Sequence, residues 1–494
     1  MKKIQLISAL VLAILALCSC NNTDYQKVIP ANATLVVKAD MKAITEKADL
    51  KNSKAMKMLD ESLVAVVKGK DMKQVKEYVD DPMKMGIDFS MPVYFFMVGE
   101  DLGLTMKVSN ESDVKDFLQV LNKQGLSSKP QEKNGLMCGT LVDDIYYSYD
   151  DNTFLLLASM NKGGGSKMGK IAQQLMEMDE KDSFVGTEAY DRLNEEDDDL
   201  VTYTNGKWGK DILSNVMSTV LPASVDVKDL DVFLSLNFEN GKASFKTHVC
   251  GKTEKAQALI DEADKNFGMI DGKYLDNVSE NMLIWFGTNV KGEWALNKLK
   301  ESKSTKEMLF MMERAIDIEQ MLRAVEGDVA LELQMLDTDM DAKDSFGYVA
   351  QAELKNTDFL ADVDDWKASM KDYGMSMSDK GKNQYLLTMD DQSYLWGVQD
   401  KDLYLASEKA DLKGSGAKFL DAYKDDIKKN KLYLYVNLSK VPFVDFAKQS
   451  GLNFLTEPLE KLESAVVRSA SSDEVTLTIN LKDKDENFLK QILQ

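Results

Sequence analysis

Alternation of apolar and polar residues predicts strands over much of the chain. The candidate strands are residues 91–98, 102–108, 136–142, 145–150, 153–158, 200–204, 231–238 and 243–250. Several are joined by very short connections, which favour antiparallel pairing because parallel neighbours need long crossovers. Amphipathic helical segments lie between them, without the regular strand–helix order of a doubly wound sheet. We therefore expect an α+β fold, with helices packed on one face of each antiparallel sheet.

The same succession of strands and helices occurs twice along the chain. Four pairs of segments match in the same order: 35–37 with 283–285, 104–108 with 349–353, 146–159 with 394–407, and 243–249 with 475–481. A constant order at a nearly constant offset is typical of an internal duplication. We expect two tandem homologous copies, with the first repeat at 28–270 and the second at 271–494. The acidic run near 195–199 is expected to be an insertion in the first copy.

Each copy contains a helix whose ends are marked in the sequence. Ser112 and Thr357 are expected N-caps, because a hydroxyl accepts hydrogen bonds from the first free backbone N–H groups. Gly125 and Gly374 are expected stops, because glycine adopts the left-handed conformation easily.

The N-terminus has the pattern of an export signal. Lys2 and Lys3 precede the apolar stretch 4–17, which is shorter than the roughly 20 residues that span a bilayer as a helix. The following Ser19-Cys20 resembles a bacterial lipobox. By this resemblance, residues 1–19 are a lipoprotein signal peptide, Cys20 carries the lipid, and 20–27 form a lipidated tether. Cys18 is the alternative, but it follows a bulky leucine.

Composition excludes several classes of function. Lys and Arg total 61 against 82 Asp and Glu, so the net charge of −21 disfavours nucleic acid as a partner. The chain has a single histidine, His248, so a Ser-His-Asp triad would have to use it and multi-histidine zinc sites are excluded. No nucleotide fingerprint or other cofactor motif is complete, and we expect no cofactor and no catalytic residues.

One acidic segment resembles the start of a calcium-binding loop. Asp337, Asp339 and Asp341 alternate, as suits a hard cation that takes oxygen ligands. Ala342 stands where glycine is expected and Tyr348 where glutamate is expected. The segment also lies between strand-like runs, so a solvated hairpin tip is the preferred interpretation and these three residues are weak metal candidates.

Other polar clusters have weaker chemical interpretations. Five adjacent acidic residues, 195–199, are expected to form an exposed, mobile segment rather than a cation site. The segment 163–170 has the glycine and lysine spacing of a phosphate loop but lacks its Ser/Thr, so we expect a flexible loop that opens a helix at 167–178. The pairs Asp143-Asp144 and Asp390-Asp391 are adjacent, and neighbours on a strand face opposite sides.

Sulfur and aromatic residues allow structural and functional interpretations. Cys138 and Cys250 are expected to be buried thiols, with a disulfide left open. Methionine is frequent, with 28 residues, and adaptable core filling is the default role of Met308, Met311, Met312 and Met321. A Met-lined recognition groove is the alternative. The tryptophans are expected to be buried, the alternative being exposed stacking platforms.

The lipobox, the opening Val28-Ile29-Pro30-Ala31-Asn32-Ala33 and the duplicated layout resemble a family of Bacteroidota lipoproteins catalogued as domain of unknown function 4836. The resemblance implies a lipoprotein of the cell envelope, on the outer membrane, with either a periplasmic or a surface-facing orientation. It supplies no active-site residues. We expect a non-enzymatic binding or assembly module, attached to the membrane through its N-terminal lipid and contacting an envelope protein or glycan. An extracytoplasmic hydrolase acting on glycan or peptide is the alternative.

Overall fold

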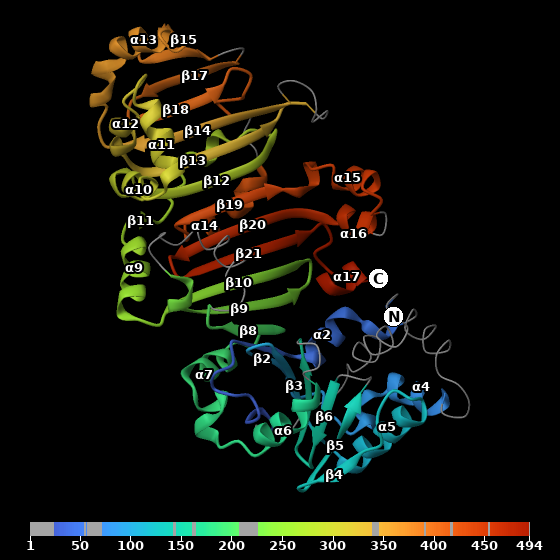
Figure 1. Ribbon diagram of the computed structural model, residues 1–494. Coiled ribbons are helices and arrows are strands. Elements are labelled where there is room, and N and C mark those ends of the chain that lie inside the picture. Colours follow the sequence, from blue (N-terminus) through green and yellow to red (C-terminus); the bar gives the residue numbers. More distant parts are fainter. Residues whose placement is uncertain are drawn as a thin grey trace. The chain divides into compact units, whose positions relative to one another are not determined.

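The computed structural model describes residues 24–53, 56, 72–141, 145–160, 165–206, 226–337, 345–389, 392–414, 418–452 and 455–493. The chain divides into two compact units (Figure 1). Unit 1 comprises Met1–Lys210, Asp231–Thr247 and Asp483–Gln494, and unit 2 comprises Asp211–Leu230 and His248–Lys482. In the described segments, no helix is long and apolar enough to span a bilayer.

The strands of unit 1 pair antiparallel in a continuous order. Their order across the sheet is β9 (Leu230–Glu239), β8 (Leu200–Thr204), β1 (Leu35–Ala39), β2 (Val93–Val98), β3 (Asp101–Lys107), β7 (Thr153–Ser159), β6 (Ile145–Tyr149), β5 (Leu136–Leu141) and β4 (Gln131–Lys133). β10 (Lys242–Gly251) pairs with β9. β1 pairs on both edges: Val37 lies opposite Phe95 of β2 on one side and Thr202 of β8 on the other.

Helices of unit 1 connect these strands. They are α2 (Met41–Ala48), α4 (Met72–Asp80), α5 (Glu111–Lys123), α6 (Gly165–Met176), α7 (Glu188–Glu195) and α17 (Phe488–Leu493). Short 3-10 turns are η1 (Asp24–Gln26) before β1 and η4 (Pro82–Met85) after α4. α17 lies close to the end of the sequence and packs against α2, so both ends of the described chain belong to unit 1.

The strands of unit 2 also pair antiparallel. Their order is β21 (Glu474–Leu481), β20 (Leu462–Ser471), β19 (Leu432–Asn437), β12 (Met282–Lys291), β13 (Val325–Met335), β14 (Phe346–Leu354), β18 (Asp402–Ser407), β17 (Gln392–Gln399), β16 (Gln384–Met389) and β15 (Met375–Gly381). The two-residue β11 (Phe267–Gly268) pairs with the end of β12. From β20 to β15, this order repeats the order from β9 to β4 in unit 1.

Helices of unit 2 follow the strands at similar places. They are α9 (Glu254–Asp264), α10 (Gly292–Leu299), α11 (Lys303–Met312), α12 (Ile318–Ala324), α13 (Val363–Lys371), α14 (Lys424–Ile427), α15 (Phe443–Gln449) and α16 (Thr456–Glu460). α13 follows β14 as α5 follows β3, and a 3-10 turn, η9 (Asp358–Asp362), opens it.

Strand positions agree closely with the prediction from alternation. All eight candidate strands of the first half are present with ends within two residues of those expected, and the antiparallel α+β fold is confirmed. Among the described strands of the first repeat, the two-residue β11 and β4 were missed, and Gln131–Lys133 of β4 is fully polar and exposed. A short edge strand without apolar residues has no alternation to detect.

Helix starts were predicted less well than helix stops. The N-cap of α5 is Asn110 rather than Ser112, because the Asn110 side chain accepts from the backbone N of Ser112 (2.9 Å) and of Asp113 (3.3 Å). Thr357 precedes η9, but its side chain makes no capping bond. Both stops are confirmed, with φ of 70° at Gly125 and 72° at Gly374.

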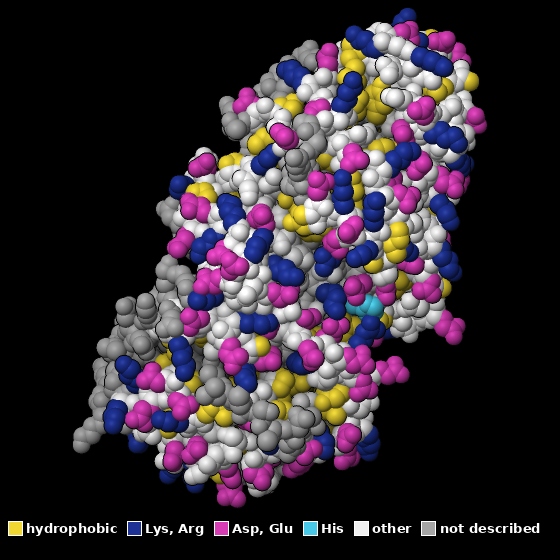
Figure 2. Space-filling view, turned by 180° about the vertical axis from the view of Figure 1, so that it is seen from behind, with side chains coloured by type: hydrophobic (Ala, Val, Ile, Leu, Met, Phe, Trp, Pro, Cys, Tyr) yellow, Lys and Arg dark blue, Asp and Glu magenta, His cyan; other side chains and the backbone are white. Residues whose placement is uncertain are grey.

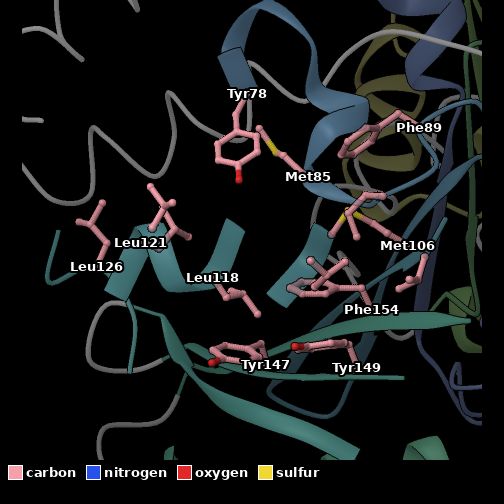
Figure 3. Packing of buried hydrophobic residues seen from close by; sticks show 14 of the residues in the cluster. Tyr78, Met85, Phe89, Met106, Leu118, Leu121, Leu126, Tyr147, Tyr149 and Phe154 are labelled. Atoms are coloured by element: carbon pink, nitrogen blue, oxygen red, sulfur yellow. The ribbon is translucent and has the colours of Figure 1, made fainter. Parts of the chain in front are cut away.

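The largest described core of unit 1 lies between α5 and the sheet (Figure 3). Val114, Leu118 and Leu121 form one apolar stripe on α5, at the spacing that places them on a single helix face. Opposite them, the rings of Tyr147 and Phe154 lie nearly parallel, with centroids 6.3 Å apart. The strip of helix and the aromatic strand surface therefore form the two walls of this core.

Helices cover both faces of the sheet in unit 1, so the expectation of one covered face is wrong there. Tyr147 faces α5, whereas its neighbour Tyr146 faces α6, where a Cβ on Gly169 would lie 3.3 Å from the Tyr146 hydroxyl. Figure 1 shows α5 and α6 on either side of β6. The sequence feature that indicates two covered faces is the uninterrupted apolar run 154–157, which is typical of a strand buried on both sides.

One buried hydroxyl in this core gives a stability prediction. Tyr149 Oη is buried and has no hydrogen-bond partner among the described residues, whereas Tyr147 Oη donates to the Ser128 carbonyl at 3.3 Å. Tyr149→Phe should leave the free energy of unfolding unchanged or raise it by about 1 kcal/mol, since it removes an unsatisfied group. The matched variant Tyr147→Phe should lower it by about 1 kcal/mol. Urea unfolding measures both, and equal losses in the two variants would contradict the assignment.

Candidate functional site

A cavity of about 150 Å³ lies inside the core of unit 1. The sheet supplies one wall, with side chains from β3, β5, β6 and β7: Met106, Leu141, Ile145, Phe154 and Leu156. α5 supplies the facing wall: Val114, Phe117, Leu118 and Leu121. Every described residue that lines the cavity is apolar.

One end of the cavity is closed by the segment that leads from α4 to β2. Met85, Ile87 and Phe89 line this end and are all buried. Gly86 holds the segment against α5: its φ is +78°, and a Cβ there would lie 2.3 Å from the Asn110 carbonyl oxygen. The Gly86 carbonyl accepts from the Asn110 backbone N at 3.2 Å, which joins this segment to the start of α5.

The other end of the cavity lies between the C-terminal end of α5 and the β5–β6 hairpin. Leu126, Leu141 and Ile145 line it; Leu126 is buried and the other two are half-buried. Figure 3 shows Leu118 and Leu121 on the helix side of this core, with the Tyr147 and Tyr149 rings side by side on the strand side. Phe117 and Leu156, on the two facing walls, are also half-buried.

An empty apolar cavity of this size destabilises the folded state. At about 24 cal/mol per Å³, 150 Å³ of unfilled core lowers the free energy of unfolding by roughly 3–4 kcal/mol. An engineered cavity of about 150 Å³, lined by leucine, isoleucine and phenylalanine, stays dry and binds benzene or xenon. The geometry and chemistry of this cavity therefore suit an apolar ligand.

Sequence reasoning did not find this cavity. It identified the helix before Gly125 and the strands 136–142, 145–150 and 153–158, which together form the walls. A cavity forms where side chains from several elements do not fill the space between them. This depends on packing between segments distant in sequence, and no local sequence pattern indicates it.

Only one of the three calcium-loop candidates lies within the described residues. Asp337 follows β13 and is exposed, whereas Asp339 and Asp341 lie outside the described residues. Within the described segments, no three His, Cys, Asp or Glu side chains are grouped as metal ligands. Asp143-Asp144 and Asp390-Asp391 also lie outside the described residues.

The phosphate-loop candidate opens a helix. Gly163 and Gly164 lie outside the described residues, and α6 begins at Gly165. Lys167 and Lys170 are exposed on this helix. The helix expected at 167–178 is therefore confirmed, with its start two residues earlier and its end at Met176.

The acidic run 195–199 is not a uniformly exposed segment, and that prediction is wrong at its last residue. Asp199 is buried, and both of its carboxylate oxygens lie 2.8 Å from Lys47 Nζ. Asp199 also accepts from the Phe238 backbone N at 2.7 Å. Glu196 pairs with Lys246 at 3.0 Å. Lys47 and the Phe238 N–H therefore compensate the burial of the Asp199 carboxylate.

His248 does not form a catalytic triad. Its Nε2 lies 3.7 Å from Asp473, and the adjacent Ser472 hydroxyl contacts Asp264 at 3.5 Å rather than the imidazole. Burial opposes ionisation of Asp264, but Lys431 Nζ at 2.8 Å and the Ser472 N–H hold its pKa below the ordinary range. Figure 2 shows the histidine at the surface, beside acidic side chains.

The cysteines and tryptophans are mostly structural. Cys138 is buried, Cys250 is half-buried, and neither forms a disulfide in the described structure. Burial is confirmed for the tryptophans at 285, 366 and 396. Trp208 and the predicted lipid-bearing Cys20 lie outside the described residues.

Core filling is wrong for three of the four singled-out methionines. Met321 is buried, but Met308, Met311 and Met312 are exposed on α11 by 49%, 65% and 37%. Five consecutive apolar residues, 308–312, wrap around the helix, and of these only Leu309 is buried. A single helix face can bury only one such stripe.

A buried carboxyl group in unit 2, that of Glu332, has a raised pKa. Glu332 on β13 accepts from the Ser279 backbone N (3.0 Å) and from Gln334 Nε2 (3.1 Å). Burial raises the pKa of Glu332 from its ordinary 4.5 to about 7, with smaller opposing effects from these hydrogen bonds. Gln334 in turn bonds the Asp411 backbone, so Glu332 belongs to a packed structural network.

This shift predicts how stability depends on pH. The folded state holds the Glu332 proton more tightly than the unfolded state, so the stabilisation is complete below about pH 4.5 and is lost as pH rises through about 7. The shift corresponds to about 3 kcal/mol. Glu332→Gln should flatten the urea-unfolding profile in this window, whereas Glu326→Gln, exposed on the same strand, should keep the wild-type profile. An unchanged slope in Glu332→Gln would refute the assignment.

Comparison with known proteins gives a family but no function. No functionally curated protein matches the sequence. Crystal forms III and IV of TP0453 match at TM-scores of 0.26 each and identities of 9% and 10%. These matches cover 51% and 45% of this chain and 89% and 79% of the TP0453 chains, a likeness too low to carry an argument. The family described as "Domain of unknown function (DUF4836)" matches residues 25–489, and the chain belongs to this family.

Proposed function

We propose that the protein is a non-enzymatic binding module of the cell envelope whose unit 1 holds an apolar ligand. The observation that carries this proposal is the wholly apolar cavity beneath α5. A natural core normally fills such a space, because packing gains are lost along every unfilled wall. A ligand inside the cavity would restore them.

The alternative, an extracytoplasmic hydrolase, has less support. Hydrolysis of glycans requires two carboxyl groups across a cleft, one of them with a raised pKa. Glu332 has a raised pKa but is packed against Ser279 and Gln334. The hollow beside Asp264 contains Asp261 and Asp473, but the pKa of Asp264 is lowered by Lys431. These carboxyl groups lack the pairing that the chemistry needs.

Anchoring through Cys20 fits this function. Residues 1–19 are proposed to be removed and Cys20 to carry the lipid, which places the protein in the cell envelope, on the outer membrane. The proposed tether is 20–27, and its residues Tyr25 and Gln26 are buried in unit 1, so this part of the tether packs against the folded unit.

We also propose that the chain arose by tandem duplication, with copies at 28–270 and 271–494. The support is the repeated strand order, in which β1, between β8 and β2, occupies the same place as β12, between β19 and β13. The segment between β7 and β8 contains α6 and α7, whereas α14 is the α-helix between β18 and β19 in the described residues. This difference agrees with an insertion in the first copy.

Benzene binding tests the cavity. Benzene should raise the unfolding temperature of the protein in a concentration-dependent way, because a ligand of the folded state stabilises it. Leu118→Phe fills the middle of the cavity and should weaken benzene binding at least tenfold while raising stability by up to about 1 kcal/mol. Val120→Ile is the matched control, since Val120 is buried on α5 but does not line the cavity. No benzene effect on the wild type would refute the proposal.

Metabolic labelling tests the anchor. Cells grown with an alkyne-bearing palmitate analogue should label the wild-type chain and the Cys18→Ala variant, while Cys20→Ala should lose the label. The two cysteines are matched controls for each other, because both follow the same apolar stretch. Label retained in Cys20→Ala would contradict the assignment.

A further inference from the structure

One helix of unit 2, α11, carries apolar side chains that its own unit does not cover. α11 follows α10 and packs against α12, and Figure 1 shows these three helices together near β13. Met308, Phe310 and Met311 are exposed on α11, Phe310 by 63%. We propose that this surface of α11 binds to a bilayer with anionic headgroups. The contact is separate from the lipid at Cys20 and from the cavity of unit 1.

The apolar surface of the helix is the first argument. Leu309 is the buried residue of α11 and attaches the helix to unit 2, together with the buried Ala315 just after it. Successive residues lie about 100° apart around a helix, so Met308 and Phe310 project from the two flanks and Met311 from the outer side. Large apolar side chains exposed together are typical of an interaction surface. Methionine is unbranched and flexible, which suits an irregular lipid surface.

The charge around Phe310 is the second argument. Lys306 lies one turn before Phe310, and the Arg314 guanidinium lies over the Phe310 ring, 5.1 Å from its centroid. Among the described residues, neither cation forms an ion pair. The carboxylate that α11 itself carries is that of Glu307, 4.0 Å from Lys303 Nζ. An aromatic ring between two such cations suits the headgroup region of an anionic bilayer, where rings accumulate and cations meet phosphate groups.

This local charge differs from that of the whole chain, whose net charge is −21. At physiological ionic strength the Debye length is about 8 Å, so the charges next to the contact dominate its electrostatics. Lys303, Lys306 and Arg314 outnumber Glu307 on and just after α11. Attraction to an anionic surface is therefore compatible with an acidic protein.

Size and shape favour a lipid surface over a protein partner. α11 has 10 residues and is about 15 Å long, whereas a stable protein interface takes about 800 Å² from each partner. A protein groove receives a helix through one stripe of side chains, but Met308 and Phe310 lie on opposite flanks. A fluid interface adapts to both flanks, and an amphipathic helix enters it by about 5–10 Å.

Vesicle binding tests this contact. The chain from residue 20 onwards, carrying Cys20→Ala so that no attached lipid contributes, is mixed with vesicles and separated by flotation. One set of vesicles is phosphatidylcholine alone, and the other is equal parts phosphatidylcholine and phosphatidylglycerol. Each cation near an anionic surface contributes about 1 kcal/mol, so binding to the mixed vesicles should be at least about fivefold stronger and should weaken with added salt. Failure to bind the mixed vesicles would overturn the proposal.

Variants on α11 test which residues make the contact. Lys306→Gln should weaken binding to the mixed vesicles about fivefold and leave binding to phosphatidylcholine unchanged. Phe310→Ala should weaken binding to both about tenfold, because apolar surface is lost. Lys371→Gln and Tyr373→Ala are the matched controls, since both residues are exposed in unit 2 at the end of α13. Binding reduced as much by the controls as by the α11 variants would contradict this assignment. All four side chains are exposed, so the urea midpoint of each variant should match the wild type.

Fluorescence tests insertion of the helix. Against the wild-type background, the added indole of Phe310→Trp should emit at shorter wavelength with the mixed vesicles and be quenched by brominated acyl chains. Tyr373→Trp should show neither effect. Dimers that Phe310→Ala abolishes, without vesicle binding, would show that this surface docks a second copy and would overturn the lipid contact. The cavity of unit 1 is tested separately by benzene, so the two proposals stand or fall independently.

Discussion

The structure of unit 1 depends on one close contact, between Gly86 and the first turn of α5. The Gly86 carbonyl accepts from the backbone N of Ser109 (2.8 Å) and Asn110 (3.2 Å), and its left-handed φ of +78° leaves no room for a side chain. This contact fixes where α5 begins, and the Asn110 cap fixes its first turn. The apolar stripe of α5 then faces the aromatic surface of β6 and β7 at a set position. The space that remains between these two walls is the cavity, so its place in the core follows from the contact at Gly86.

Buried carboxylates hold backbone N–H groups inside both units. In unit 1, Asp199 binds Lys47 and the Phe238 N–H. In unit 2, Asp328 is buried and accepts from the backbone N of three consecutive residues, 271–273, and from Asn289. A buried carboxylate with several N–H donors is well satisfied. An acidic composition, with net charge −21, therefore coexists here with carboxylates that serve as structural acceptors.

Sequence predicted the elements of the fold better than their packing. Strands were found because side chains alternate between faces, and stops were found because Gly125 and Gly374 take a left-handed φ. The cap at Asn110 was missed because several good capping residues are adjacent there. Burial of Asp199 and the raised pKa of Glu332 depend on neighbours that are distant in sequence. The local charge pattern therefore predicted exposure for Asp199, which is wrong, and gave no indication of the raised pKa of Glu332. The cavity depends on packing alone, while its walls were visible in the sequence.

The central claim is that unit 1 contains a real, apolar space. A crystal structure of the mature chain under pressurised xenon tests it most directly, because xenon enters dry apolar cavities and is easily located. The account predicts a xenon atom between Leu118 and Phe154, and its absence from the same place in Leu118→Phe. A cavity filled by repacked side chains or by ordered water in the wild-type crystal would contradict it.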